Sequence, residues 1–449
     1  MMRDDSATPA APPPDDAASG IGAPPAESSS IRVASAPFSS PAAAASSLSG
    51  RTVFVMVFLP FALGHFLSCL MRTVNATLAP QLVAALALTP GELGLLTSAF
   101  FLAFALAQLP VGMALDRWGP GTVQPPMLLL AGVGALAFAG GHTFTQLLVA
   151  RAVIGLGLGG CFMSAVKAIS TWIAPARLPS VQGYLIAIGG LGAAAATLPV
   201  RMALDYMDWR GLFLWLAAAA ALIGFLIRAL SPPQPGAARK PALLDAMREV
   251  YRHPAFREMA ALVLVPHTVF FGIQGLWIGR WLSDVARYSD NAVGYLLYLG
   301  MAAVIFGAIA VGMITEWAGR RGVQPIRVAA AGVALFIAVQ VGFVCNWRPS
   351  YQLLSVLFTL VGTVTGIEYT IVALSLPGAL TGRAATCLNL LIFLGAFAVQ
   401  AGFGLVVGCW RPDVTGHYPA QSYQAAFALL VLLQLPGLIW FVRRAGAIR

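Results

Sequence analysis

The fold is decided by two stretches of fifteen residues, VGMALDRWGPGTVQP at residues 111–125 and VGMITEWAGRRGVQP at residues 311–325. Seven of the fifteen positions are identical, at a constant offset of 200 residues and without a gap. Each stretch follows one apolar run and precedes another, and the identities at Gly119 and Gln124 lie in the polar turn between the runs. The chain is therefore predicted to consist of two halves that repeat one architecture.

Around these stretches the composition is that of a membrane protein. Of the 449 residues, 59% are apolar and 10% are charged, and the mean hydropathy is +0.81. Soluble domains are about half apolar and a quarter charged, so an ordinary cytosolic enzyme is excluded. The net charge of +10 does not indicate a nucleic-acid binder, because the Lys and Arg residues lie between long apolar runs rather than in clusters.

The apolar runs are continuous and too long for the strands of a β-barrel, which alternate over roughly ten residues. A membrane-spanning helix needs roughly 20 mostly apolar residues. The predicted segments are 53–84, 92–115, 123–141, 146–171, 181–203, 211–230, 258–283, 292–315, 325–345, 351–376, 384–409 and 423–442. We therefore predict an all-α membrane protein with twelve transmembrane helices in two pseudo-symmetric six-helix bundles.

The division of the chain follows its composition. In residues 1–50, Ala, Pro, Ser and Gly account for 35 of the 50 residues, so we expect a disordered N-terminal tail. Residues 51–230 and 258–449 are predicted to form the two bundles, joined by a cytoplasmic linker at 231–257. With both termini in the cytoplasm, 18 of the 27 Lys and Arg residues fall on that side, in line with the positive-inside rule. We expect the inner membrane of a bacterium.

Four motifs fit this arrangement. They are Gly112-x-x-x-Asp116-Arg117-x-Gly119, Gly312-x-x-x-Glu316-x-x-Gly319-Arg320-Arg321, Arg151-x-x-x-Gly155-x-Gly157 and Trp209-Arg210-x-x-Phe213. With the twelve segments they make the chain resemble the major facilitator superfamily over residues 52–443. The resemblance implies a transporter that works by alternating access. It implies gating roles for Gly112, Asp116, Arg117, Gly119, Glu316 and Arg320.

The first segment carries an unusual polar face. His65, Ser68, Arg72 and Asn75 are spaced by three, four and three residues, which places them on one side of a helix. A charge at membrane depth needs a partner or a wet cavity, and the planar fork of Arg72 suits carboxylate or phosphate. We predict substrate contacts for His65, Arg72 and Asn75, with a structural ion pair of Arg72 as the alternative. An arginine in helix one is similar to the organic-anion and sugar-phosphate carriers of the superfamily.

Proton coupling is the predicted role of Glu368 and His267. Glu368 is the one acid within an apolar segment of the second half, and burial favours the protonated form of a carboxyl group. His267 lies 202 residues after His65, at a nearly equivalent position of its half, and imidazole can relay protons. The alternative is a permanent ion pair between Glu368 and an embedded Arg or Lys.

Four further residues are substrate-binding candidates. Gln274 lies two helical turns after His267, and Trp277 is close to the same face. Arg151 lies at membrane depth in the fourth segment, and Asn389 shares a face of the eleventh with Gln400. The resemblance implies that helices one, four, seven and ten line the central cavity, and most of the candidates fall on those helices.

The sequence therefore predicts a secondary active transporter for a small anionic metabolite, with symport of protons as its possible coupling. Efflux of a hydrophobic compound and a membrane sensor that does not transport are the alternatives. We expect no enzyme activity, cofactor or metal, because neither a nucleophile–base pair nor a C-x-x-C or G-x-x-x-x-G-K-[ST] motif occurs. The expected partners are the small-molecule substrate, protons and the lipid bilayer, without nucleic acid, and the expected state is a monomer.

Overall fold

The computed structural model describes residues 50–173, 177–232, 243–376 and 378–446. Within these ranges the secondary structure is helical and no strand occurs. Twelve helical segments are long and apolar enough to cross a membrane, which confirms the predicted fold class. The predicted tail, apart from its last residue, and residues 233–242 of the predicted linker lie outside the described ranges. The exact boundaries of the two bundles remain a prediction.

Six of the twelve spans belong to the first half. Its helices are α2 (Gly50–Val53), the π-helix η1 (Phe54–Phe58), α3 (Leu59–Thr73), α4 (Asn75–Leu86), α5 (Pro90–Trp118), α6 (Pro120–Ala139), α7 (Phe144–Leu158), α8 (Cys161–Trp172), α9 (Leu178–Ala195), α10 (Leu198–Ala203) and α11 (Trp209–Leu230). Side-chain caps set several boundaries: Thr89 and Glu92 form a capping box at the start of α5, and Thr143 and Gln146 form one at α7.

The second half repeats the pattern. Its helices are α12 (Leu243–Arg252), α13 (Pro254–Met259), η3 (Ala260–Leu264), α14 (Val265–Gly272), η4 (Ile273–Trp277), α15 (Ile278–Asp284), α16 (Asp290–Arg320), α17 (Pro325–Val344), η5 (Arg348–Ser350), α18 (Tyr351–Gly362), η6 (Thr363–Gly366), α19 (Ile367–Ser375), α20 (Gly378–Val407) and α21 (Ala420–Gly446). Helices dominate because backbone groups in a bilayer must be hydrogen-bonded within the protein.

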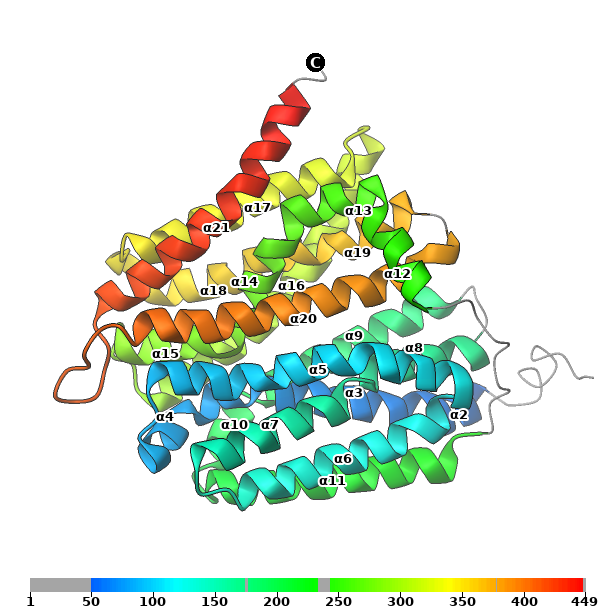
Figure 1. Cartoon of the computed structure of the whole chain (residues 1–449), viewed down its shortest axis with the longest axis horizontal. Coiled ribbons are helices and arrows are strands. Elements are labelled where there is room, and N and C mark those ends of the chain that lie inside the picture. Colours follow the sequence, from blue (N-terminus) through cyan, green and yellow to red (C-terminus); the bar gives the residue numbers. More distant parts are fainter. Residues whose placement is uncertain (1–49, 174–176, 233–242, 377, 447–449) are drawn as a thin grey trace, which may run out of the picture. The chain divides into compact units, whose positions relative to one another are not determined.

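The two halves meet mainly along α5 and α20, which run side by side (Figure 1). Phe393 of α20 packs between rings of α5, with its centre 5.9 Å from that of Phe101 and 4.5 Å from that of Phe104. Contacts of α9 and α10 with α16, and of α3 and α4 with η4 and of α4 with α15, also join the two halves. This interface is where an alternating-access transporter would hold its substrate.

The interface is tightest where α5 begins and α20 ends. A Cβ atom added at Gly94 would lie 2.8 Å from the backbone oxygen of Gln400, and one at Gly404 would lie 2.4 Å from that of Pro90. Near the opposite helix ends, a Cβ atom at Gly112 would meet no other atom within 4 Å. The helices of the two halves therefore pack closely at one end of the interface, and the glycine near the other end has free space beside it.

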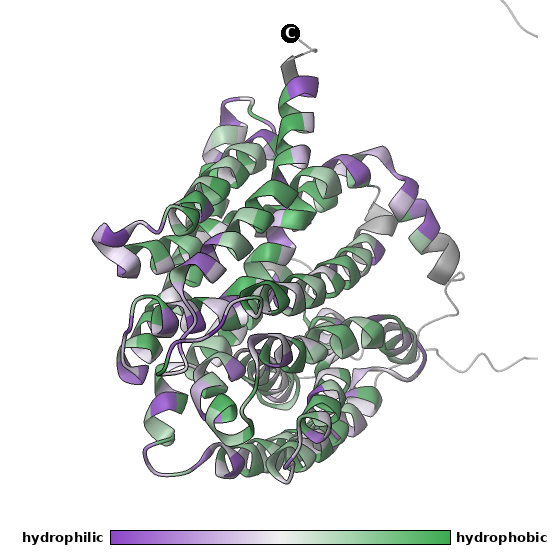
Figure 2. Ribbon diagram, turned by 60° about the vertical axis from the view of Figure 1, so that its left-hand side comes forward, coloured by the Kyte–Doolittle hydropathy of each residue, from purple (hydrophilic) through white to green (hydrophobic). Residues whose placement is uncertain are grey.

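The outer surface is apolar. Hydrophobic residues cover the helices in Figure 2, and hydrophilic ones gather at helix ends and loops. Large side chains such as Trp215, Phe306 and Leu374 are about 70% exposed (69%, 69% and 71%). Exposed apolar area of this extent indicates a surface that meets lipid.

The first predicted segment, 53–84, is interrupted. The α-helix stops at Thr73, residue Val74 is in a turn, and α4 starts at Asn75. Neither proline nor glycine occurs at the break, so the sequence does not signal it. A similar irregularity lies 199 residues later, where α14 ends at Gly272 and gives way to the π-helix η4. Breaks of this kind expose backbone carbonyl groups to other partners.

Candidate functional site

The centre of the candidate site is Arg72, in the last turn of α3. Its side chain is half-buried, and its guanidinium carbon lies 5.1 Å from the centre of the Phe271 ring. Its Nη2 group is 3.9 Å from the Cys69 sulfur atom. Among the described residues, Arg72 forms no ion pair. A cation at membrane depth without an anionic partner is costly, so this group is available for an anion.

Arg151 has a different environment. Its side chain is fully buried, and its two Nη groups donate to the backbone oxygens of Met71 and Arg72, at 2.7 and 3.2 Å. The guanidinium carbon also lies 5.0 Å from the centre of the Phe100 ring. Arg151 therefore supplies donors to the last turn of α3, beside the break at Val74. Its predicted substrate contact remains a prediction.

The other cations at membrane depth have acidic partners. The Lys167 ammonium lies 2.6 Å from Asp116 Oδ1 and also donates to the Leu115 carbonyl. The Arg280 guanidinium lies 3.0 Å from Asp284 Oδ1. Both charges are compensated within their own half of the protein, unlike that of Arg72.

His267 and Glu368 form a hydrogen-bonded pair between α14 and α19, through Nδ1 and Oε1. Both side chains are buried. The second carboxyl oxygen, Oε2 of Glu368, has no hydrogen-bond partner among the described residues. Glu368 is thus paired with a group that can gain or lose a proton, rather than with a permanently charged Arg or Lys. The arrangement can hold a proton on either partner.

Aromatic side chains connect the pair to Arg72. The Phe271 ring contacts Arg72 on one side, and its centre lies 5.0 Å from that of the His267 ring on another. The Tyr369 ring lies edge-on to the His267 ring, with the ring centres 6.5 Å apart. Its hydroxyl group donates to Asn389 Oδ1 at 2.5 Å. Arg72, His267, Glu368 and Asn389 therefore belong to one neighbourhood at the interface of the two halves.

Sequence reasoning missed Phe271 and Tyr369. Phe271 follows His267 by four residues, which places it on the same helix face, and Tyr369 is adjacent to Glu368. These spacings were a usable signal, but aromatic residues do not stand out in apolar helices. Only the contacts reveal their position between the charged groups.

Two candidates of the first segment have polar contacts of their own. His65 is half-buried, with its ring nitrogens 4.0 and 3.8 Å from the Cys69 sulfur atom. Asn75 is fully buried and donates from Nδ2 to Thr97 Oγ1 at 3.4 Å, whereas its Oδ1 has no partner among the described residues. His65 lies two turns from Arg72 in α3, and Asn75 lies beyond the break.

Gln274 and Trp277 lie in η4, one turn apart. Gln274 is half-buried and donates to the Met301 sulfur atom at 3.4 Å. Trp277 is buried and donates from Nε1 to the backbone oxygen of Gln400 at 3.0 Å. Trp277 therefore packs into the closed end of the interface. The substrate contacts predicted for these two residues remain predictions.

The two gating loops differ. Gly119 ends α5 with φ of 76°, a left-handed value that favours glycine. In the second loop, Gly319 is inside α16, and the positive φ falls at Gly322. Asp116 pairs with Lys167, whereas Glu316 pairs with Arg320 one turn along its own helix at 2.6 Å.

The remaining gating candidates make few contacts. A Cβ atom added at Gly112 or at Gly312 would meet no other atom within 4 Å. The guanidinium carbon of Arg117 lies 5.0 Å from the centre of the neighbouring Trp118 ring. The loops thus repeat in sequence without repeating their ion pairs. Their gating roles remain predictions.

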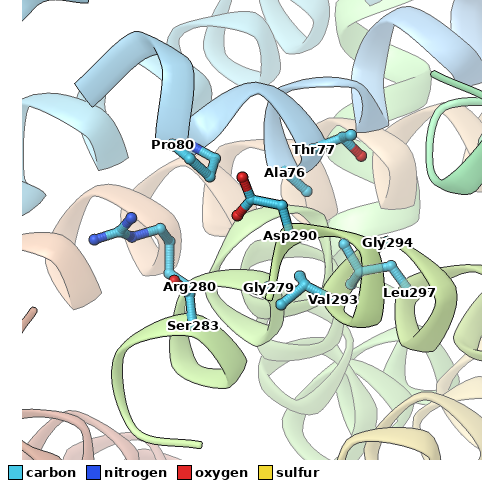
Figure 3. A pocket seen from close by; sticks show the side chains of 10 residues that line it. All are labelled: Ala76, Thr77, Pro80, Gly279, Arg280, Ser283, Asp290, Val293, Gly294 and Leu297. Atoms are coloured by element: carbon cyan, nitrogen blue, oxygen red, sulfur yellow. The ribbon is translucent and has the colours of Figure 1, made fainter. Parts of the chain in front are cut away.

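A small cavity of about 20 Å³ lies between α4 and the helices α15 and α16 (Figure 3). In Figure 3 the Asp290 carboxylate lies beside Pro80 of α4, and the Arg280 guanidinium points away from it. This volume is about that of one water molecule. A larger cavity, of about 240 Å³, lies nearby and is lined by Trp277, Arg280 and Tyr423 among others. Neither cavity is lined by Arg72.

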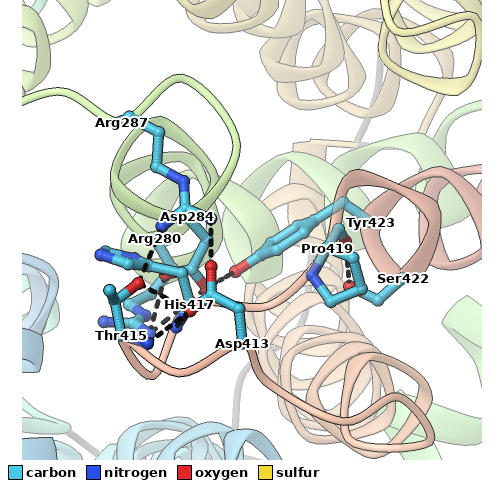
Figure 4. Close-up of polar contacts among 9 residues, drawn as sticks. All are labelled: Arg280, Asp284, Arg287, Asp413, Thr415, His417, Pro419, Ser422 and Tyr423. Carbon is cyan, nitrogen blue, oxygen red and sulfur yellow. Dashed lines mark hydrogen bonds and ion pairs between the residues drawn. The ribbon is translucent and has the colours of Figure 1, made fainter.

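A polar network closes this end of the second half (Figure 4). Asp284 accepts hydrogen bonds from Tyr423 at 2.6 Å and Arg280 at 3.2 Å, and His417 lies 3.1 Å from its other oxygen. In the loop between α20 and α21, Asp413 accepts from Arg287 at 2.5 Å. Hydrogen bonds from Thr415, Arg287 and the His417 backbone lower the pKa of Asp413 well below its usual range. The network anchors the loop to α15.

Comparison with known proteins identifies the architecture. The model of the Major Facilitator Superfamily matches residues 61–400. The chain belongs to the major facilitator superfamily. The solved structure of a bacterial homolog of the human lysosomal transporter Spinster, inward-facing and unoccupied, superposes with a TM-score of 0.73. It is 16% identical, and the match covers 88% of this chain and 97% of that one. At this identity the likeness shows the fold alone.

Two curated relatives within the superfamily are transporters by name. The probable sulfoacetate transporter of Cupriavidus necator is 24% identical over 400 residues, covering 83% of this chain and 90% of the relative. The probable L-galactonate transporter of Escherichia coli is 24% identical over 306 residues, covering 62% and 64%. The protein is thus a multi-pass membrane transporter of the superfamily and not an enzyme.

Proposed function

We propose that the protein carries a small organic anion across the bacterial inner membrane by alternating access, with Arg72 as the anion-binding group. The observation that carries the proposal is the charge of Arg72, which has no acidic partner among the described residues. The other embedded cations are occupied by carboxylates or carbonyl groups. A substrate anion would supply the missing negative charge, as a bidentate partner of the guanidinium group.

The relatives support the class of substrate. Sulfoacetate and L-galactonate, which name two relatives, are both small organic anions. The Tyr369 hydroxyl and the Asn389 amide are hydrogen-bonded to each other, and these groups suit the hydroxyl or second polar group of such compounds. Efflux of a hydrophobic compound fits this neighbourhood less well, because a lone guanidinium group would remain unneutralised.

Uneven packing along the interface supports alternating access. The ends of α5 and α20 near Pro90 and Val407 are in close contact, and a Cβ atom at Gly112, toward the other end of α5, would have free space. If both termini are cytoplasmic, the closed end faces outward, and the state described here is inward-facing. We propose that Asp116 and Lys167 belong to the gate on the cytoplasmic side.

Proton symport is the second part of the proposal. The His267–Glu368 pair is buried one aromatic ring away from Arg72. A proton bound to this pair would compensate the negative charge of the substrate during transport. Glu368 is proposed as the proton carrier and His267 as its partner.

The test of the anion site uses purified protein in proteoliposomes. Arg72→Lys should weaken binding of sulfoacetate or L-galactonate by about tenfold or more, because an ammonium group cannot form the bidentate contact. Arg72→Ala should abolish binding and counterflow while the protein still folds. The matched control is Arg201→Lys, because Arg201 pairs with Asp205 at 2.9 Å outside the site, and this variant should bind normally.

Failure would be clear in either of two results. Normal anion binding by Arg72→Ala would exclude Arg72 as the anion site. Absence of counterflow by the wild-type protein with every small organic anion tested would refute the substrate class.

A further inference from the structure

We propose that Phe271 is a positioning residue of the anion site: its ring separates Arg72 from Glu368 and so prevents the carboxylate from occupying the place of the substrate. The inference rests on the proposed function, because it concerns the same anion site. The proposed role of Phe271, to keep Glu368 away from Arg72, needs no polar group on the side chain.

The contacts link the two charged groups through the ring. The centre of the Phe271 ring lies 5.1 Å from the Arg72 guanidinium carbon and 5.0 Å from the centre of the His267 ring. His267 in turn holds Glu368 by a hydrogen bond. The contacts therefore run from the Arg72 guanidinium group through the Phe271 and His267 rings to the Glu368 carboxyl group.

Neighbouring rings hold Phe271 in place. Its centre lies 5.8 Å from that of Phe270 and 5.7 Å from that of Phe393, both in edge-to-face geometry. Phe393 belongs to α20 and also packs against α5. The ring thus has contacts from both halves of the transporter and cannot easily turn aside without disturbing them.

Without the ring, the charged groups would compete with the substrate. Arg72 has no acidic partner, and Oε2 of Glu368 has no hydrogen-bond donor among the described residues. Phe271 contacts both Arg72 and His267, and His267 holds Glu368, so the two groups share one neighbourhood. Opposite charges attract strongly where water is scarce. A Glu side chain freed to reach Arg72 would neutralise the guanidinium group and exclude an external anion.

The experiment compares single and double variants. Phe271→Ala should weaken binding of sulfoacetate and L-galactonate by about tenfold or more, the scale of a new ion pair at a buried site. Adding Glu368→Gln should restore most of the affinity, because the amide cannot neutralise Arg72. The matched control is Phe343→Ala, which removes a buried ring packed against Phe358 and Phe427 in the same half and should bind the anions as the wild type does.

The rescue distinguishes this task from the alternatives. If Phe271 acts only by packing, or only by its cation–π contact with Arg72, Glu368→Gln will not restore binding to Phe271→Ala, and the inference is overturned. Unchanged affinity of Phe271→Ala also overturns it. If Phe271→Ala does not fold, Phe271→Val with and without Glu368→Gln replaces it, and the same outcomes decide.

Failure of the proposed function would look different. A wild-type protein that binds no organic anion removes both the anion site and this inference. A wild-type protein that binds anions, with a Phe271→Ala variant that binds them equally, removes the inference alone.

Discussion

Replacement of Glu368 by Gln is the most informative single change at the proposed proton site. The amide resembles the protonated carboxyl group in shape but cannot release a proton. In the structure, Glu368 is fully buried and joined to His267 through Oε1. Gln can accept the same hydrogen bond, so the variant should fold.

The expected energies differ between variants. Glu368→Gln exchanges a charge-assisted hydrogen bond for a neutral one, at a cost of about 1 kcal/mol in stability. Glu368→Ala removes the partner of His267 and leaves a cavity, at a cost of about 3–5 kcal/mol. For transport, one coupled proton yields about tenfold accumulation per unit of pH difference, since one pH unit corresponds to about 1.4 kcal/mol.

The assay compares two modes of transport in the same proteoliposomes. Counterflow of labelled L-galactonate or sulfoacetate at equal pH needs no proton release, and the Glu368→Gln variant should retain it. Accumulation of the substrate driven by a pH gradient should fall from about tenfold per pH unit in the wild type to none in the variant. Accumulation that persists in Glu368→Gln would refute the role of Glu368 as proton carrier. Loss of both modes, with intact folding, would instead indicate a structural pair.

Two further predictions concern the surroundings of the site. Arg151→Leu should cost about 2 kcal/mol of stability, by removing two charge-assisted hydrogen bonds, and should weaken anion binding by Arg72, with partial recovery in Arg151→Lys. Thermal unfolding and binding titration measure both effects, and unchanged affinity in a folded variant would contradict the link. Asp116→Asn should release Lys167 and shift the protein away from the state described here, in which the two side chains are paired, by up to about fivefold, the range of an exposed ion pair. Labelling of Asn389→Cys from the cytoplasmic side, in a background without the exposed cysteines, should fall accordingly, and an unchanged rate would count against a gate.

The twelve spans were predictable because each apolar run is long and continuous, with charge confined to the intervals. Arg72 and Glu368 were predictable as candidates for the same reason, since a charge in an apolar helix is conspicuous. The number of predicted segments equals the number of observed spans among the described residues, and the ends of the segments differ by several residues. The largest difference is the break at Val74.

The contacts of the site were not predictable from the sequence. Asp116 and Lys167 are 51 residues apart in the chain, and their pairing depends on how α5 packs against α8. Phe271 resembles any other apolar residue of its helix until its neighbours are known. Arg151 was recognisable as a charge at membrane depth, but its carbonyl partners became visible only once α3 was seen to end beside it.

The interrupted helices of the two halves bear on how the protein could have evolved. The helix ends at the breaks lie 199 residues apart, yet their carbonyl groups are satisfied by unrelated side chains: Arg151 of α7 in the first half and Gln400 of α20, which donates to Gly272 at 3.1 Å, in the second. If the two halves arose by duplication, both kept an interrupted helix, and a different side chain satisfies the exposed carbonyl groups in each half.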